Sequence, residues 1–153
     1  MSSQPPAVFP SIDARFACFC IAVRESAIHR YGVYAQERIP ERRKVIEYTG
    51  ERISRRETRR RCDAEIGLNY LFTVDNYWTI DGSKGGSGAE YINHCCDPNL
   101  MTSIVKGHIL YMSKRVIEPG EELTVDYHFP KNVEKVVCKC GSPKCRGTIN
   151  LLK

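Results

Sequence analysis

The segment Asn93-His94-Cys95-Cys96-Asp97-Pro98-Asn99 decides the interpretation of this chain of 153 residues. Two further segments follow it: residues 121–127, an acidic run that ends in Tyr127, and residues 138–145, which hold three cysteines. Asn93 and His94 offer hydrogen-bond donors and acceptors that suit a nucleotide-like ligand, and a tyrosine hydroxyl can address a reacting polar group. The three segments together predict a binding site and a metal site in the last third of the chain.

Length and composition indicate a single globular domain. At 153 residues roughly 70% of the unfolded surface can be buried, which is enough for a core. No segment approaches the ~20 apolar residues that span a membrane, and residues 1–10 lack the features of a secretory signal. We therefore expect an intracellular protein without a membrane segment. Eight cysteines in such a protein favour reduced thiols or a metal site over disulfides.

The net charge of +5 is concentrated in an arginine-rich segment, residues 52–61, which holds six arginines. Such a segment is most often the solvated face of a helix. The alternative is a docking patch for nucleic acid or for an acidic protein. No aromatic residue interleaves with these arginines in the sequence, which argues against a platform for stacking single-stranded bases.

Short apolar runs separated by turn residues predict a mainly β domain. The only helix of any length is expected at 52–66, where the apolar stripe is weak. Residues 81–88 are rich in glycine and are expected to form a loop. Strands are expected at 16–23, 31–35, 44–49, 69–74, 77–80, 100–105, 108–116 and 123–127, with hairpin turns at Asp75-Asn76 and Lys106-Gly107.

Cys138, Cys140 and Cys145 form a candidate zinc site. Structural zinc sites are usually closed by four ligands, and Cys96 is the natural fourth. Zinc would then fasten the C-terminus to residues 93–99. The alternative is that these are unrelated buried cysteines, which pack as small hydrophobic side chains. The other four cysteines show no ligand spacing and are expected to be core or incidental: Cys18, Cys20, Cys62 and Cys95.

Taken together, these segments resemble the SET-domain lysine methyltransferases. Residues 93–99 are similar to the family's Asn-His-Ser-Cys-x-Pro-Asn, and residues 122–127 to its Glu-Leu-x-Tyr/Phe-Asp-Tyr. Residues 138–146 resemble the post-SET zinc tail, and residues 45–50 resemble the strand that ends in Glu-Tyr-x-Gly. The similarity runs from about Ala22 to the C-terminus and is closest to the trithorax branch.

The resemblance implies a mainly β SET fold, with small curved sheets around a pseudoknot, one short helical insert and a C-terminal zinc-bound tail. It implies an N-terminal tail at 1–15, a SET domain at 16–130 and a post-SET tail at 131–153. The implied activity is protein-lysine N-methylation, in which S-adenosylmethionine and the target lysine enter from opposite faces and meet in a narrow channel.

The resemblance also assigns roles to individual residues. Tyr127 is expected at the methyl-transfer point, while Tyr48, Phe72 and Val125 are expected to line the lysine channel. Packing alone remains the competing interpretation for several of these side chains. The residues expected to bind S-adenosylmethionine are His29, Tyr31, Gly32, Tyr70, Asn93, His94 and Lys139. Those expected to bind structural Zn²⁺ are Cys96, Cys138, Cys140 and Cys145.

The chemistry requires a neutral lysine, although the unperturbed lysine pKa is about 10.4. An aromatic channel and the positive charge of the cofactor both lower that pKa, so no dedicated base is required. The implied substrate is a histone tail, and activating protein partners are expected. The implied location is nuclear or chromatin-associated, or cytoplasmic in a microbe.

Several positions depart from the family pattern, among them Arg30, Val125 and Glu90. Arg30 replaces a glycine of the first loop, which removes backbone freedom near the cofactor. Val125 stands where tyrosine or phenylalanine is usual, which predicts a wider channel and more than one methyl group added. Glu90 replaces an arginine, without an explanation from the sequence. Two other interpretations stay open: a weakly active SET fold that binds peptide or chromatin, and a small zinc-dependent nucleic-acid binder.

Overall fold

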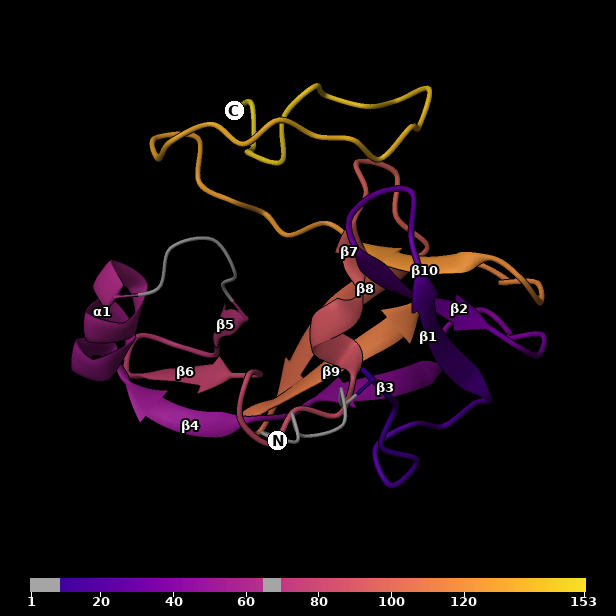
Figure 1. The fold of residues 1–153 in the computed structure, drawn as a ribbon, viewed down its shortest axis with the longest axis horizontal. Coiled ribbons are helices and arrows are strands. Elements are labelled where there is room, and N and C mark those ends of the chain that lie inside the picture. Colours follow the sequence, from indigo (N-terminus) through magenta and orange to yellow (C-terminus); the bar gives the residue numbers. More distant parts are fainter. Residues whose placement is uncertain (1–8, 65–69) are drawn as a thin grey trace, which may run out of the picture.

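The computed structural model describes residues 9–64 and 70–153, which form three small β-sheets, one α-helix and a short 3₁₀-helix (Figure 1). The prediction of a mainly β fold with one short helical segment is confirmed. Its elements are β1 (Ile21–Glu25), β2 (Tyr31–Ala35), β3 (Lys44–Tyr48), β4 (Glu51–Ser54), α1 (Arg55–Ala64), β5 (Leu71–Thr73), β6 (Trp78–Asp81), η1 (Ala89–Tyr91), β7 (Asn93–His94), β8 (Leu100–Val105), β9 (His108–Ser113) and β10 (Glu122–Val125).

The first sheet brings the two polar segments of the sequence together. Its strand order is β1-β2-β10-β7, so β10 lies between β2 and β7 although it comes last in the chain. β10 is parallel to β7, and Val125 lies opposite His94. A parallel pair requires a long connection. Here the connection is β8 and β9, which form the second sheet with β3 in the order β3-β9-β8.

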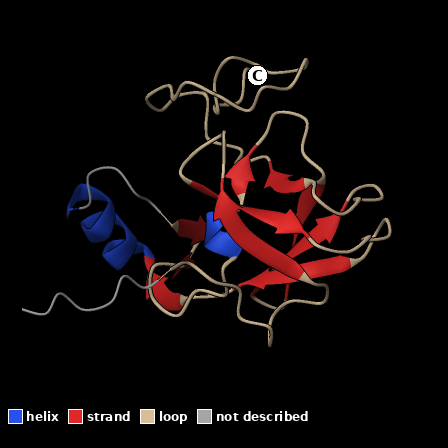
Figure 2. Ribbon diagram, turned by 45° about the vertical axis from the view of Figure 1, so that its right-hand side comes forward, coloured by secondary structure: helices blue, strands red, loops and turns tan. Residues whose placement is uncertain are grey.

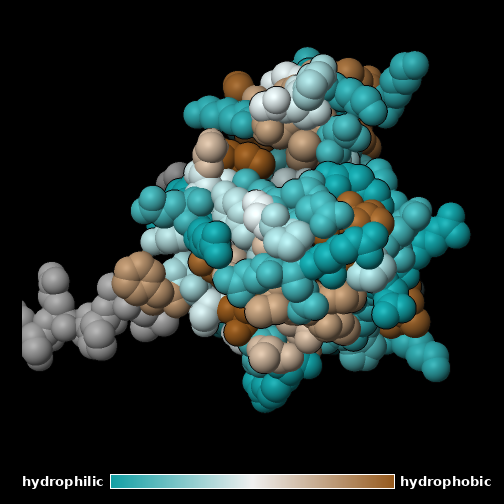
Figure 3. All heavy atoms as spheres, turned by 90° about the vertical axis from the view of Figure 1, so that its right-hand side faces the viewer, coloured by the Kyte–Doolittle hydropathy of each residue, from teal (hydrophilic) through white to brown (hydrophobic). Residues whose placement is uncertain are grey.

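The hydrophobic core lies between the first and second sheets. Alternate residues of the strands point into it, as the twofold period of a β-strand requires. β9 shows this clearly, since Ile109 is 0% and Tyr111 2% exposed. Ile12 and Ala17, outside the strands, also pack against this core. The face shown in Figure 3 is largely hydrophilic, with separate hydrophobic groups among the charged side chains.

The third sheet and α1 form a lateral insert (Figure 2). Its order is β4-β6-β5. The predicted helix at 52–66 is wrong at its start, because residues 51–54 form β4 and the helix begins at Arg55. Ile53 is buried at 4% exposure, and the Ser54 hydroxyl accepts the backbone N–H of Glu57 at 3.2 Å. This N-cap begins the helix where the strand ends. Residues 65–69, which include the expected helix end and the start of a predicted strand, lie outside the described residues.

Another predicted strand begins later than expected. Residues 16–20 of the strand expected at 16–23 lie outside β1, and Ala17 makes only an isolated bridge with Ile46. The backbone there bonds to β3 instead: Cys18 N–H donates to the Val45 carbonyl at 2.9 Å. No described helix is long and apolar enough to cross a membrane.

The C-terminal segment, residues 131–153, crosses above the first sheet as a loop (Figure 2). Asn150, 1% exposed, organises it. The Asn150 Oδ1 accepts the Val136 N–H at 2.9 Å, while its Nδ2 donates to the Pro130 carbonyl at 3.0 Å. Leu151 N–H donates to the Phe129 carbonyl at 2.9 Å, which closes the segment back onto the end of β10. The division at 1–15, 16–130 and 131–153 stays a prediction.

Candidate active site

A cavity of about 1290 Å³ lies between the insert, the first sheet and the C-terminal segment. Its walls come from parts of the chain that are far apart in the sequence, as expected for a binding site. Gly32 is outside the lining. The lining includes all the other predicted cofactor and channel residues: His29, Tyr31, Tyr48, Tyr70, Phe72, Asn93, His94, Val125, Tyr127 and Lys139.

Asn93 holds the first loop along the cavity. Its Nδ2 donates to the Tyr31 carbonyl at 2.8 Å and to Glu122 Oε1 at 3.0 Å. The Ser26 hydroxyl donates to the same Glu122 oxygen at 2.8 Å. Gly32 makes this arrangement possible, because a Cβ at that position would lie 2.2 Å from Glu122 Oε1. The visible role of Gly32 is therefore close packing against Glu122.

Arg30 also lines the cavity, and its backbone has a φ of 34°. Positive φ values are unfavourable for residues other than glycine and cost of order 1 kcal/mol. The usual glycine would adopt this conformation freely. The loop therefore keeps the backbone geometry of a glycine at a position where the sequence has arginine.

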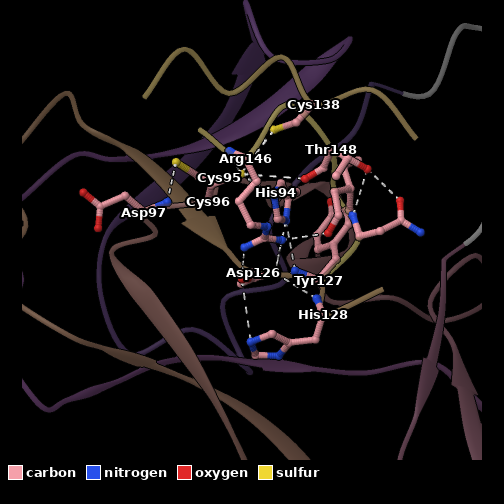
Figure 4. A network of polar contacts seen from close by, with 12 residues as sticks. His94, Cys95, Cys96, Asp97, Asp126, Tyr127, His128, Cys138, Arg146 and Thr148 are labelled. Atoms are coloured by element: carbon pink, nitrogen blue, oxygen red, sulfur yellow. Dashed lines mark hydrogen bonds and ion pairs between the residues drawn. The ribbon is translucent and has the colours of Figure 1, made fainter. Parts of the chain in front are cut away.

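His94 lies between Tyr127 and Cys96 (Figure 4). Its Nδ1 accepts the backbone N–H of Tyr127 at 3.1 Å, and its Nε2 lies 3.4 Å from Cys96 Sγ. Because Nδ1 is an acceptor, the neutral ring carries its proton on Nε2, directed at the sulfur. Burial lowers the pKa of His94 to about 4, so the ring is neutral at pH 7.

Arg146 is a site residue that the sequence analysis missed. Its guanidinium donates to Asp126 Oδ2 at 2.7 Å and to the Ile149 carbonyl at 2.8 Å. Its backbone N–H points at Cys96 Sγ at 3.3 Å. Burial raises the pKa of Asp126, but the bonds from Arg146 and the His128 N–H outweigh it and lower the pKa below its usual value. Arg146 thereby fastens the C-terminal segment to the end of β10. The position next to Cys145 is the only sequence feature that pointed to it.

Tyr127 lines the cavity and is held there by its hydroxyl and its ring. The O–H donates to the Ile92 carbonyl at 2.6 Å, and its ring packs against His94 with 5.4 Å between ring centroids. Burial raises the pKa of this hydroxyl, although the residue as a whole is 38% exposed. The phenol therefore stays protonated at neutral pH. Its proton is committed to Ile92, so the free lone pair of the oxygen can accept a hydrogen from a bound group.

An aromatic wall lines the part of the cavity near the insert. The ring centroids of Tyr48 and Phe72 are 5.2 Å apart, and those of Tyr48 and Tyr111 are 6.1 Å apart. The hydroxyl of Tyr48 donates to the Tyr70 carbonyl, which fixes its ring. Tyr111 was not predicted, although its place in the alternation of β9 would have indicated an inward side chain. Val125, 2% exposed, also lines the cavity.

Glu90 lines the cavity as a half-buried carboxylate, and burial raises its pKa. Its Oε2 accepts the Gly88 N–H at 2.8 Å. A Cβ at Gly86 would lie 2.4 Å from its other oxygen. Glu90 therefore fastens the glycine-rich loop before η1, which accounts for an acidic residue at this position.

The four predicted zinc ligands come together. The Sγ atoms of Cys96, Cys138, Cys140 and Cys145 all lie within 4.8 Å of one another, and those of Cys96 and Cys138 are 3.7 Å apart. Tetrahedral zinc with Zn–S bonds of about 2.3 Å separates its sulfurs by about 3.8 Å. The cluster therefore has the geometry and the donor atoms of a structural zinc site.

The protonation of these thiols also suits a cation. Burial raises the pKa of Cys96 and of Cys138, while N–H donors and neighbouring thiols overcome burial at Cys140 and lower its pKa to about 6. The cluster by itself does not favour four thiolates. A divalent cation would supply the missing positive charge. Of the other cysteines, Cys95 is buried, whereas Cys18, Cys20 and Cys62 are exposed.

The family model described as "SET domain" matches residues 30–128, which include the strands from β2 to β10, the insert and most of the residues that line the cavity. The chain therefore belongs to the SET-domain family. The predicted resemblance to the SET-domain lysine methyltransferases is confirmed.

Similar proteins are named for the same chemistry. The chain is 40% identical over 141 residues to "Histone-lysine N-methyltransferase, H3 lysine-4 specific" of Eremothecium gossypii, covering 85% of this chain and 14% of that protein. It is 41% identical over 136 residues to the protein of the same name from Saccharomyces cerevisiae, covering 82% of this chain and 13% of that protein. These relatives agree with the trithorax-branch resemblance. The chain thus spans about a seventh of the length of these relatives.

A solved structure supports the fold. The chain is similar to a chain in "Crystal structure of an active polycomb repressive complex 2 in the stimulated state", with a TM-score of 0.70 and 33% sequence identity. The match covers 76% of this chain and 16% of that chain.

Proposed function

We propose that this SET domain is a protein-lysine N-methyltransferase that uses S-adenosylmethionine. The observation that carries the proposal is the single cavity into which Asn93, His94, Tyr127 and the aromatic wall all project. S-adenosylmethionine would supply the methyl group. His29, Tyr31, Tyr70, Asn93, His94 and Lys139 are the residues proposed to hold it, with Gly32 acting through the packing of the loop.

The chain's own residues would position and neutralise the amine. The lone pair of the Tyr127 oxygen can accept an N–H of the amine, which holds the nitrogen in place. Tyr48 and Phe72 exclude water, and this lowers the pKa of a lysine placed between them. Because the Tyr127 phenol stays protonated, water takes the proton. Catalysis then rests mainly on alignment.

The zinc site has a positioning role in this proposal. Cys96, Cys138, Cys140 and Cys145 would hold Zn²⁺ and so keep Lys139 at the cavity. His94 adds a direct link, since its Nε2–H points at Cys96 while its Nδ1 accepts the Tyr127 N–H. The metal site and the methyl-transfer tyrosine are therefore joined through one imidazole.

The degree of methylation follows from Val125. In the parallel pair its neighbour is His94, and a tyrosine or phenylalanine there would project a ring into the cavity that valine leaves open. A bulky ring limits the space around a partly methylated amine. We propose that this enzyme adds more than one methyl group.

The substrate and partners are proposed from the relatives. Those named as specific for lysine 4 of histone H3 support a histone H3 tail and a nuclear, chromatin-associated location. The similar polycomb chain belongs to a complex, which supports activating protein partners for this chain as well.

The test is methylation of a histone H3 tail peptide with labelled S-adenosylmethionine, with the products resolved by mass spectrometry. Tyr127→Phe is compared with Tyr77→Phe, which removes the same hydroxyl from a residue that is 74% exposed. We expect loss of at least tenfold in kcat for the first variant and no change for the second. Equal rates for both variants would contradict the role of Tyr127.

A second function is favoured by one observation. The positive φ of Arg30 in the first loop would weaken cofactor binding and leave a domain that binds peptide or chromatin. Isothermal titration separates the two functions. Peptide binding without any heat from S-adenosylmethionine would support the second.

A further inference from the structure

The arginine-rich segment is the strongly charged feature that methyl transfer leaves unexplained. Its six arginines divide into two groups in the structure. Arg61 turns inward, where its side chain is 11% exposed and bonds to three carboxylates: Glu51 at 2.9 Å, Glu57 at 2.8 Å and Asp81 at 2.6 Å. Arg60 also pairs with Glu57, at 2.6 Å. The charges of these two arginines are therefore neutralised by carboxylates within the fold.

The other four arginines face outward. Arg56 and Arg59 are three positions apart on α1 and therefore lie on one side of the helix. Both are exposed, and among the described side chains of residues 9–62 and 70–153 neither forms an ion pair with a carboxylate. Arg52 and Arg55 bond only to uncharged groups there, the Gly107 carbonyl at 3.1 Å and the Thr73 hydroxyl at 3.2 Å. Their positive charge is available to a partner.

Two exposed aromatic side chains lie beside these arginines. Tyr77 is 74% and Trp78 is 40% exposed. The pairing of β4 with β6 sets Trp78 opposite Ser54, and the Arg55 N–H donates to the Tyr77 carbonyl at 3.2 Å. The guanidinium of Arg52 lies 5.8 Å from the centroid of the Trp78 ring. Strand pairing therefore supplies the aromatic residues that the arginine run lacks in the sequence.

We propose that this surface binds single-stranded nucleic acid. We call it the arginine–aromatic surface, and it consists of Arg52, Arg55, Arg56, Arg59, Tyr77 and Trp78. Guanidinium groups bind phosphates in pairs of hydrogen bonds, and aromatic rings stack on unpaired bases. The carboxylates of an acidic protein would form ion pairs with the arginines but would not stack on the two exposed aromatic rings. The combination of charge and rings therefore favours nucleic acid.

The acidic side chains described beside this surface already have partners. Glu51 and Glu57 are held by Arg61. Asp75 accepts the backbone N–H groups of Tyr77 and Trp78 at 2.7 and 2.8 Å, which fixes the hairpin turn.

The arginine–aromatic surface adjoins the cavity. Thr73, which accepts the bond from Arg55, also lines the cavity. A single strand of nucleic acid bound to this surface would hold the domain beside its protein substrate. This activity goes beyond methyl transfer and does not depend on it.

The test is fluorescence anisotropy with a labelled oligo(U) strand, titrated with the whole chain at several salt concentrations. Tyr77→Ala should weaken binding at least about fivefold, which corresponds to the loss of one stacked base. The double variant Arg56→Gln/Arg59→Gln should weaken binding and lower the slope of log affinity against log salt by about 1.4, at about 0.7 per lost phosphate contact.

The matched control is Arg38→Gln/Arg42→Gln, which removes the same charge from two exposed arginines outside the surface. It should bind oligo(U) nearly as well as the parent chain. Equal weakening by both double variants would overturn the proposal, since binding would then follow net charge alone. Equal affinity for a duplex with no effect of Tyr77→Ala would also overturn it. So would binding of poly-glutamate in place of oligo(U). Thermal unfolding of each variant identifies any loss of folding.

Discussion

Gly32 offers the sharpest test of how the first loop is built. Replacing it with alanine would place a Cβ 2.2 Å from Glu122 Oε1, whereas ordinary contacts exceed about 3.4 Å. The Glu122 carboxylate must then move by more than about 1 Å. This movement breaks its bonds from Ser26 Oγ at 2.8 Å and Asn93 Nδ2 at 3.0 Å.

The cost follows from those two bonds. Hydrogen bonds to charged groups contribute about 1.5 kcal/mol each or more, so Gly32→Ala should lower the free energy of unfolding by about 3 kcal/mol. In a domain of this size that lowers Tm by roughly 6–12 °C. Because Asn93 loses an anchor, affinity for S-adenosylmethionine should fall as well. Thermal unfolding and isothermal titration measure the two effects.

A double-mutant cycle tests the cause. In a Glu122→Ala background the clash with the carboxylate is absent and only the tight contact with Ser26 Cβ at 3.1 Å remains. Gly32→Ala should then change stability by less than about 1 kcal/mol, since alanine in a strand is itself slightly favourable. If Gly32→Ala cost the full ~3 kcal/mol in both backgrounds, the carboxylate would not be the cause. The reasoning about the first loop would then be refuted.

Four further outcomes are expected. Thr79→Val should leave stability unchanged or raise it by about 1 kcal/mol in chemical denaturation, because the Thr79 hydroxyl is fully buried and has no hydrogen-bond partner in the described structure; a loss above 1 kcal/mol would reveal a hidden partner. Val125→Phe should shift the product toward monomethyl-lysine in mass spectra, and an unchanged product distribution would exclude Val125 as the determinant. Burial raises the pKa of Glu90, so the contribution of this carboxyl to stability is complete below the unfolded pKa of about 4.3 and is lost as pH rises through the folded pKa. Glu90→Gln should therefore gain stability relative to the parent chain as pH rises from 4 to 8. Parallel profiles of stability against pH for the two proteins would contradict this. Removal of zinc by a chelator should expose residues 131–153 to proteolysis and weaken cofactor binding, with both effects reversed by added Zn²⁺; a segment that stays protected throughout would argue against a metal in the cysteine cluster.

Removal of zinc should also affect the surroundings of Tyr127, because His94 connects the cysteine cluster to this residue. His94 bonds to both sides, so loss of the metal should disturb the imidazole as well as the C-terminal segment. Hydrogen bonds to the residues that ligate a metal commonly fix the orientation of both partners. A shift in the NMR resonances of the His94 ring on chelation would report this connection directly.

The local pattern of the sequence determined much of this protein. The alternation of apolar residues located most strands, and Asp75-Asn76 and Lys106-Gly107 marked two hairpins, because strand periodicity and turn chemistry depend on near neighbours. The motifs at 93–99 and 138–145 identified all four members of the cysteine cluster and, in the cavity, Asn93, His94 and Lys139. The start of the helix expected at 52–66 could not be obtained this way, since Ile53 is held in β4 by pairing with Thr79 of β6.

Only the tertiary structure decided which distant groups meet. It placed Tyr111 in the aromatic wall, joined Arg146 to Asp126, set Glu122 against Gly32 and brought Tyr77 and Trp78 to the outward arginines. The contact of Arg146 depends on the path of the C-terminal segment, and the others depend on how the strands pair and pack, which places residues tens of positions apart within a few ångströms. No local pattern carries that information. The energy of a contact depends on the distance between two groups in space, and spacing along the sequence does not determine that distance.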